Sequence, residues 1–278
     1  MELGLSTSML GRYALPEQLA ILGAEGIPWV EIHGYAREEF DYFDRDLVRA
    51  TAAALQRWDL RLWACHSPAG GTLDVAAEEK EVRQHSVEVL RQTIRVAADL
   101  GARVVVCDAS REVPRDWRRR RRQALLADSL QRLLEEADRA RVRLVIENHQ
   151  WWALFETPED FHELVAAYTL PGLGACWDTG HGWLAGHPPE SACRLGAHLL
   201  TVHLHDNDGR RDLHLLPTEG SMAWEALVAG LREVGYAGPF MMELAPPNHP
   251  TDEAISDLVR RAHDVYRRLV AAGPAPLR

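Results

Sequence analysis

Residues 143–150 read RLVIENHQ, a continuous apolar run that ends in the polar side chains of Glu147, Asn148 and His149. Residues 103–108 read RVVVCD and end in the same way, at Asp108. Unbroken apolar runs are typical of parallel strands buried on both faces, because strands with one face in water alternate apolar and polar residues. These two stretches therefore predict a parallel sheet whose strands end in side chains capable of metal binding or proton transfer.

The same pattern recurs along the whole chain, with helical stretches between the apolar runs. The predicted strands cover residues 3–6, 29–33, 61–66, 104–108, 144–148, 174–178, 200–203 and 240–243. Among the helical stretches, TPEDFHELVAAY starts with Thr157 as a helix cap and Pro158 as its first helical residue. Eight strands that alternate with helices predict an α/β fold, a single (β/α)8 TIM barrel that forms one domain over residues 1–278. A doubly wound open sheet is the alternative.

The length and composition agree with this class of fold. The chain has 278 residues, of which 46% are hydrophobic, and a (β/α)8 barrel typically has about 250 residues. The first residues, MELGLSTSMLGRY, lack the charged start and apolar run of a signal peptide. No segment reaches the roughly 18–20 apolar residues of a membrane span. We therefore expect a cytoplasmic protein without a membrane partner, and assembly into a homo-oligomer is left open.

The charged residues argue against several function classes. The formal net charge of −10 disfavours nucleic acid as the main partner, because phosphate binding normally needs a basic face. Lys80 is the only lysine and lies near a predicted helix start, which argues against a Schiff-base aldolase. The sequence has no phosphate-binding glycine loop and no G-x-S-x-G nucleophile elbow. The four cysteines form no C-x-x-C pair, and we expect them to be small buried residues.

Seven predicted strands end in a residue that can bind a metal or transfer a proton: His33, His66, Asp108, Glu147, Asp178, His203 and Glu243. Because the carboxyl ends of all strands meet at one rim of a barrel, these side chains should converge at one mouth. Several carboxylates in a site of reduced dielectric would repel one another without a cation. The last four come from consecutive strands and predict a site for Mn²⁺, Mg²⁺ or Co²⁺, with Zn²⁺ also suitable: Glu147, Asp178, His203 and Glu243.

Four motifs on these strands carry a family resemblance that covers essentially the whole chain. They are IENHQ (146–150), DTGHGWLAG (178–186), HLHDNDGRRDLH (203–214) and MELAP (242–246). They resemble the xylose isomerase-like barrels, a superfamily that includes sugar isomerases and epimerases, inosose dehydratases and DNA repair enzymes of the endonuclease IV type. The resemblance implies a (β/α)8 barrel and a metal-dependent enzyme.

The resemblance also assigns roles to individual residues. It implies that the four residues named above are the shared metal ligands and that His181 faces the same pocket. His66 resembles a histidine that often ends the third strand in this family. Asp212 and His214 resemble the Asp-x-His pair of endonuclease IV, which joins the equivalent of His181 around another zinc ion. Together with Asp108, these residues could bind additional metal or substrate.

Two positions depart from the family pattern. Endonuclease IV has a zinc-binding histidine at the end of the fourth strand, where this chain has Asp108, and that change argues against a full trinuclear zinc site. The family segment after the Asp-x-His pair usually carries a glycine where this chain has Thr218. Threonine there is costly wherever the backbone needs a positive φ.

Two glutamates beside a metal indicate proton transfer next to a carbonyl group. Glu147 and Glu243 could remove and return a proton while the metal stabilises an enediolate, with His181 binding a substrate hydroxyl or relaying a proton. This scheme predicts an isomerase or epimerase that acts on a small sugar, sugar phosphate or polyol. The alternative is an endonuclease IV-like phosphodiesterase with up to three zinc ions. A non-catalytic metal-binding barrel is a third hypothesis, and in it the glutamates are ligands only.

Aromatic and basic residues near the predicted mouth allow more than one interpretation. We assign His33, Trp151 and Trp183 to substrate binding. The indole faces of the two tryptophans can stack on sugar C–H surfaces. Trp152 and Trp177 also lie close in sequence to the predicted strand ends that form the mouth. Any of these tryptophans could equally be a core or interface residue. The arginine run at residues 118–122 is either a solvated helical face or a contact for a phosphorylated ligand.

Overall fold

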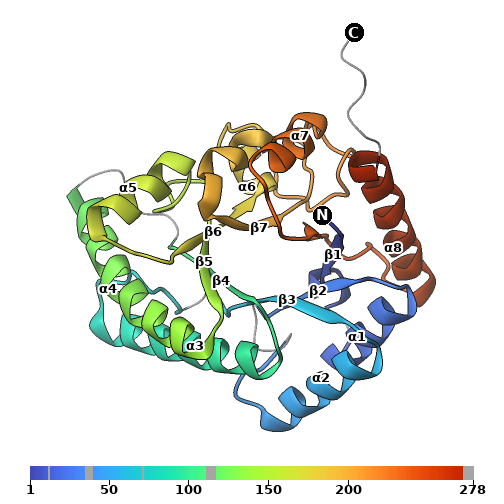
Figure 1. The fold of residues 1–278 in the computed structure, drawn as a ribbon, viewed down its shortest axis with the longest axis horizontal. Coiled ribbons are helices and arrows are strands. Elements are labelled where there is room, and N and C mark those ends of the chain that lie inside the picture. The colour runs from blue at the N-terminus through green and yellow to red at the C-terminus, as the bar shows by residue number, and fades with distance from the viewer. Residues whose placement is uncertain (12, 35–39, 71, 111–116, 272–278) are drawn as a thin grey trace.

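The computed structural model describes residues 1–11, 13–34, 40–70, 72–110 and 117–271. Short strands alternate with longer helices around a central ring (Figure 1). The strands are β1 Leu3–Ser6, β2 Trp29–His33, β3 Arg61–His66, β4 Val104–Asp108, β5 Arg143–Glu147, β6 Gly174–Asp178, β7 Leu199–His203 and β8 Phe240–Met242. The helices are α1 Leu15–Ala24, α2 Arg45–Arg57, α3 Lys80–Asp99, α4 Trp117–Ala140, α5 Pro158–Tyr168, α6 Thr179–Leu184, α7 Glu225–Glu233 and α8 Asp252–Tyr266, with 3₁₀ segments at Thr7–Leu10 and Pro189–His198 and a π turn at Arg267–Ala271.

The strands form an eight-stranded parallel sheet that closes into a barrel. Their order is β7-β6-β5-β4-β3-β2-β1-β8. The ring closes between β7 and β8, where the N–H of Leu204 donates to Met241 (2.9 Å) and the N–H of Glu243 donates to Leu204 (3.3 Å). The prediction of a (β/α)8 TIM barrel is therefore confirmed, and the doubly wound open sheet was wrong. Glu243 follows β8 directly instead of ending it.

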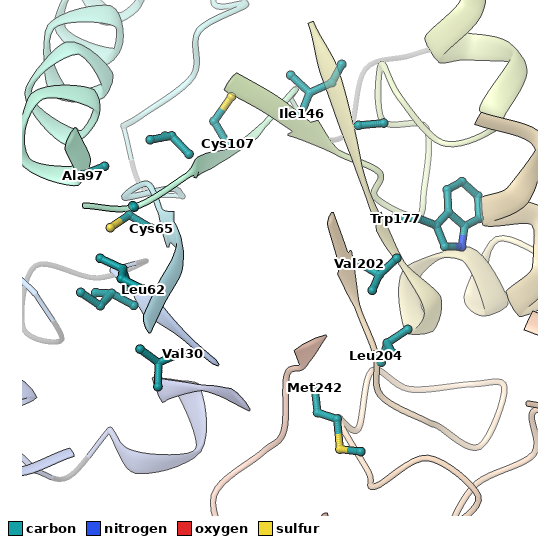
Figure 2. Packing of buried hydrophobic residues seen from close by; sticks show 14 of the residues in the cluster. Val30, Leu62, Cys65, Ala97, Cys107, Ile146, Trp177, Val202, Leu204 and Met242 are labelled. Carbon is teal, nitrogen blue, oxygen red and sulfur yellow. The ribbon is translucent and has the colours of Figure 1, made fainter. Parts of the chain in front are cut away.

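Two apolar layers hold the barrel together. Inside the ring, one cluster of buried strand side chains packs together: Trp29, Trp63, Ala64, Val104, Val106, Val145, Cys176 and Met241. Outside it, the opposite face of each strand packs against the helices, as Figure 2 shows for Val30, Cys65, Ile146 and Val202. Trp177 belongs to this outer layer and is fully buried. Cys65, Cys107 and Cys176 are buried free thiols, as the sequence predicted, whereas the free thiol of Cys193 is only half-buried.

Local signals in the sequence fix the ends of several helices. Thr157 caps α5, and its side chain and that of Asp160 form a reciprocal capping box around Pro158. Asp178 caps the short helix α6, whose first residues follow β6 without a break. The arginine run at residues 118–122 forms the first turns of α4. None of the described helices is both long enough and apolar enough to cross a membrane.

Candidate metal centre and active site

The four candidate ligands converge at the carboxyl end of the barrel. Each of them offers one donor atom, and these atoms all lie within 4.8 Å of one another: Glu147, Asp178, His203 and Glu243. All four side chains are buried. They belong to or directly follow β5, β6, β7 and β8, so one side of the ring supplies the complete group.

The backbone around Asp178 is held by a neighbouring amide side chain. Asn148, just after β5, accepts a hydrogen bond from the Asp178 N–H (2.7 Å) and donates to the Asp178 carbonyl (3.1 Å). The Asp178 carboxylate accepts from the His181 N–H (2.7 Å), which caps α6 and turns His181 toward the mouth. Nδ1 of His181 lies 2.9 Å from the Asn148 carbonyl. The ends of β5 and β6 are therefore locked together where the candidate ligands begin.

The two ring nitrogens of His203 face different carboxylates. Nδ1 lies 3.1 Å from Glu147 and 3.2 Å from Glu243, while Nε2 lies 3.0 Å from Glu31 of β2. Burial alone would lower the pKa of His203, but the acidic groups around it, first Cys176, then Glu31 and Glu147, hold that pKa well above its usual value. Burial alone would also raise the pKa values of Glu147 and Glu243, yet the facing imidazole holds both well below their usual range.

This donor set fits a divalent cation. Three carboxylates and one imidazole form a hard, oxygen-rich group of the kind that binds Mn²⁺, Mg²⁺, Co²⁺ or Zn²⁺. Glu31 lies behind His203, and a hydrogen bond from Nε2–H to this carboxylate would leave the Nδ1 lone pair directed at the other donors. Metal-binding histidines are commonly oriented by such a partner.

A second group of possible ligands adjoins the first. Nε2 of His66 lies 3.0 Å from Glu147 and 4.0 Å from Asp108, and the donor atoms of these three residues lie within 4.8 Å of one another. Asp108 also faces Nε2 of His149 at 2.9 Å. Burial alone would lower the pKa of His66, but the Glu147 carboxylate raises it. The structure thus brings Asp108 close to two imidazoles, those of His66 and His149.

A third group lies on the long segment after β7. His205, Asp212 and His214 place their donor atoms within 4.8 Å, and the rings of His205 and His214 stack with centroids 3.8 Å apart. Asp212 also lies 3.1 Å from Nε2 of His181, and this group lies beside the first one because Nε2 of His205 is 2.9 Å from Asp178. Gly180 makes the approach possible, since a Cβ atom there would lie 1.9 Å from the His205 ring.

Charge coupling is strong in this third group. Burial alone would lower the pKa of His181, but Asp178 and Asp212 raise it to about 10. The hydrogen bond with Asp212 likewise outweighs burial at His214 and raises its pKa to about 9. Burial would raise the pKa of Asp212, but its contacts with His181 and His214 hold it far below the usual range.

The segment that carries Asp212 and His214 is built around the buried carboxylate of Asp206. This carboxylate accepts hydrogen bonds from five donors: the N–H groups of Asn207, Thr218, Ser221 and Met222, and Nε1 of Trp224. Thr218 has a φ of 80°, so it occupies the positive-φ conformation that is costly for threonine and easy for glycine. The Asp206 hydrogen bonds fix this strained turn.

These groups line an open pocket of about 430 Å³ at the barrel mouth, within the usual range for a small-ligand site. Among the residues assigned from sequence, the pocket is lined by His33, His66, Asp108, Glu147, Trp151, His181, Asp212, His214 and Glu243. Nε2 of His33 lies 3.3 Å from Glu243. Asp178 and His203 are fully buried and do not line the pocket.

Trp183 contacts the segment after β7. It is absent from the described lining of the pocket, and its Nε1–H donates to Ser221 (2.9 Å) on the segment after β7. Trp177, another candidate near the mouth, lies in the outer apolar layer. Its side chain points to the opposite face of β6 from Asp178, because neighbouring residues of a strand alternate between faces.

Trp151 and Trp152 project from the loop after β5 and are 59% and 57% exposed. Both have left-handed backbone conformations, with φ of 56° and 67°, which is unfavourable for bulky residues. The Trp152 N–H donates to Glu156 (2.8 Å), and Arg119 of α4 donates to the Ala153 carbonyl (2.8 Å). The surrounding contacts therefore hold the two indoles at the rim at the cost of backbone strain.

Two side chains of the arginine run at residues 118–122, those of Arg119 and Arg122, are neither a solvated helical face nor free to contact a phosphorylated ligand. Arg119 also donates to the Leu154 carbonyl (3.3 Å) and to Asp160 (2.8 Å). Arg122 pairs with Asp74 and donates to Ser110 (2.7 Å). These two side chains tie α4 to loops at the mouth, so they act as structural anchors within the described part of the chain.

Sequence reasoning missed three residues of the site: Glu31, His149 and His205. His149 and His205 lie inside motifs already recognised, IENHQ and HLHDND, two residues after Glu147 and His203 respectively. Glu31 had a subtler signal. It is a charged residue inside an apolar strand, two positions before His33, and the period of two in a strand places both on the inner face of the barrel.

Comparisons with known proteins agree with the fold and the motifs. The family model described as "Xylose isomerase-like TIM barrel" matches residues 18–262. An uncharacterized protein of Methanocaldococcus jannaschii, MJ1311, is 31% identical over 178 residues, which are 62% of this chain and 60% of that relative's length. A "Probable endonuclease 4" of Mycobacterium leprae is 28% identical, over 76% of this chain and 81% of its own. The L-ribulose-5-phosphate 3-epimerase UlaE of Shigella flexneri is 25% identical, over 72% and 69%.

Solved structures share the architecture over nearly the whole chain. A D-tagatose 3-epimerase-like protein superimposes with a TM-score of 0.79 at 24% identity, over 96% of this chain and 99% of its own. The IOLI protein, solved with a bound zinc atom, gives a TM-score of 0.82 at 17% identity, over 98% and 100%. At sequence identities this low, the superpositions establish the shared fold alone.

Proposed function

The chain belongs to the xylose isomerase-like TIM barrel family, and from this premise we propose that it is a divalent-metal-dependent sugar isomerase or epimerase. The observation that carries the proposal is that Glu147 and Glu243 face the same atom, Nδ1 of His203, at 3.1 and 3.2 Å. In the barrel, β5 and β8 are separated by β6 and β7. The two glutamates therefore approach the site from the two ends of this run of neighbouring strands.

The four convergent residues would hold the cation: Glu147, Asp178, His203 and Glu243. When bound, a divalent ion supplies positive charge that stabilises the enediolate formed by loss of a proton next to a carbonyl group. Because most of the donors are carboxylates, manganese, cobalt and magnesium suit the site best, and zinc also fits.

The residues of this chain would divide the proton transfer between them. Glu147 removes a proton from the carbon next to the carbonyl on one side of the sugar, and Glu243 returns one on the other side. His181, held by Asp212 at 3.1 Å, binds a substrate hydroxyl and keeps the sugar oriented. Trp151 and Leu244 provide apolar walls in the same pocket, against which the C–H face of a sugar packs.

A second candidate function is metal-dependent cleavage of a phosphodiester. The observation that favours it is the presence of two further groups of donors beside the first, one with His66, Asp108 and Glu147 and one with His205, Asp212 and His214. The relative named as an endonuclease points the same way. Against it, an aspartate stands at position 108, and a contact with His149 already occupies that side chain.

Metal stoichiometry separates the two candidates. Elemental analysis of protein purified without added metal or chelator should give about one divalent ion per chain for the isomerase or epimerase. Two or three zinc ions per chain would favour the phosphodiesterase and direct the next assays to phosphodiester substrates.

Exchange of solvent deuterium tests the reaction itself. The protein loaded with manganese or cobalt should incorporate deuterium from D₂O into a ketose at a carbon next to the carbonyl. Glu147→Gln and Glu243→Gln should each lower the rate at which the substrate sugar is converted to the product sugar by roughly 10²-fold or more. The variant that keeps the glutamate facing one of these two sugars should still exchange label with that sugar. Glu135→Gln, on the exposed face of α4, serves as the control. Unimpaired interconversion by Glu243→Gln would rule out the two-glutamate scheme.

A further inference from the structure

A second cavity of about 270 Å³ adjoins the main pocket. It lies between the loop after β3, the first half of α3 and the end of β4, and it shares Asp108 with the main pocket. His66 lines the main pocket, while the next residue, Ser67, lines the second one. Asp108 therefore stands between the two cavities, and a ligand that passes this side chain would occupy both of them.

The walls of the second cavity are amphipathic. Leu73, Val75 and Leu90 form an apolar side, and Ser67 and Ser110 provide hydroxyl groups. The Ser67 hydroxyl is buried and has no hydrogen-bond partner within the described residues. A buried hydroxyl without a partner is costly, and a polar ligand group in the cavity would supply the missing bond.

Ser110 is held in a strained conformation beside this cavity. Its φ of 142° is rare for a residue other than glycine, and its side chain is buried. Arg122 donates to the Ser110 hydroxyl at 2.7 Å and thereby fixes its position. Backbone strain that the surrounding structure maintains is commonly found at binding sites.

The charges around the cavity select for a neutral ligand. Both acidic residues in its wall have partners, since Asp74 pairs with Arg122 and Asp108 faces His149 at 2.9 Å. No arginine or lysine is among the described residues that line the cavity. A phosphate or carboxylate would meet no cation among the described lining residues that is not already paired, whereas sugar hydroxyls can donate to Asp74 and Asp108 and the C–H face of the ring can pack on the leucines.

From this geometry we propose that the second cavity is a subsite for a second sugar ring. The substrate is then a ketose that carries a glycosyl substituent, with its reacting carbons in the main pocket and the substituent beyond Asp108. This inference rests on the proposed sugar isomerase or epimerase function and names the class of substrate for it.

The test compares a free ketose with ketose disaccharides that keep the reacting carbons unsubstituted. Fructose, lactulose (a galactosyl group on O4) and isomaltulose (a glucosyl group on O6) are incubated in D₂O with the manganese-loaded protein, and label incorporation gives kcat/KM. Ala69→Phe fills the cavity from its loop wall, and Ala69→Ser is the matched control. Ser110→Ala removes one hydroxyl without filling space. Binding of lactulose is measured separately by saturation-transfer NMR.

A subsite predicts that the better disaccharide is used at least roughly tenfold more efficiently than fructose, and that Ala69→Phe removes this advantage without changing the fructose rate. Ser110→Ala should lower the disaccharide kcat/KM by roughly fivefold. The unchanged fructose rate also shows that the variants are folded. Equal kcat/KM for fructose and both disaccharides, unaffected by Ala69→Phe, would mean that the cavity holds only water and would overturn the inference.

The binding measurement separates this inference from the proposed reaction. If lactulose binds the unaltered protein and Ala69→Phe weakens that binding, but no probe exchanges label, the subsite stands and the proposed reaction is wrong. If no probe binds or exchanges label, both are wrong.

Discussion

Nε2 of His203 lies 3.0 Å from Oε1 of Glu31, and both side chains are completely buried. Glu31 comes from β2 and reaches His203 of β7 across the interior of the barrel. On the opposite edge of the same imidazole, Nδ1 faces Glu147 and Glu243. The contact with Glu31 therefore sets which edge of the ring is presented to a cation.

This relationship predicts that Glu31→Gln weakens metal binding without unfolding the chain. A neutral amide removes the charged acceptor for the imidazole, and loss of such outer partners typically costs about 10–100-fold in metal affinity. Calorimetric titration of the metal-free protein with Mn²⁺ measures the change in the Kd for the metal. Glu25→Gln, at the end of α1, is the control. An unchanged Kd in Glu31→Gln would assign Glu31 a packing role only.

Removal of the cation should destabilise the protein as well as inactivate it. The buried carboxylates of the candidate centre repel one another once the ion is extracted, and binding to the folded state alone adds about 2.7 kcal/mol when the metal concentration is 100 times Kd. Thermal unfolding with and without chelator checks this, followed by addition of Mn²⁺, Co²⁺ or Zn²⁺. A midpoint that does not respond to chelator or to added metal would contradict a resident ion at this site.

Asp206→Asn should destabilise the segment that carries Asp212 and His214. Its carboxylate accepts hydrogen bonds from several N–H donors, and an amide nitrogen at this buried position would face some of them. We expect the free energy of unfolding to fall by about 3 kcal/mol, as measured by urea denaturation. Asp208→Asn, two residues further on and exposed to solvent, should change it by less than about 0.5 kcal/mol. Similar effects of the two variants would show that the Asp206 hydrogen bonds do not stabilise this segment.

Arg119→Ala should loosen the loop that carries Trp151. The substitution leaves the Ala153 and Leu154 carbonyls and Asp160 without their guanidinium donor. Because Trp151 lines the pocket without taking part in proton transfer, KM should rise by roughly tenfold while kcat changes little. Arg120→Ala, in the same turn of α4 but exposed, is the control. A fall in kcat at constant KM would mean that Arg119 affects the candidate metal centre itself.

Most of the fold could be predicted because its signals are local. The apolar run at residues 144–146 and the capping box at Thr157 each specify an element without reference to the rest of the chain. The positions of the candidate ligands follow from the barrel rule that strand ends share one rim. That rule places Glu147 and Glu243 near each other although 95 residues lie between them in sequence.

The parts that could not be predicted depend on contacts between distant segments. Arg119 and Arg122 read as a charged helical face, and only the packing of α4 against two loops turns them into anchors. The sequence puts Trp177 near the mouth or in the core, and the alternation of the strand sends its side chain to the face of β6 opposite Asp178. The second cavity is also invisible in the sequence, because its walls come from the loop after β3, from α3 and from the end of β4 together.

Asp178 combines two duties that Glu147 does not share. Its carboxylate caps α6 through the His181 N–H and contacts His205, whereas the Glu147 carboxylate contacts the imidazoles of His66, His181 and His203. In evolutionary terms, a lineage that abandoned the chemistry would still be selected to keep an aspartate at position 178 for folding. Position 147 would drift first, so the order in which the acids disappear among descendants of this chain would record when a member lost the proposed reaction.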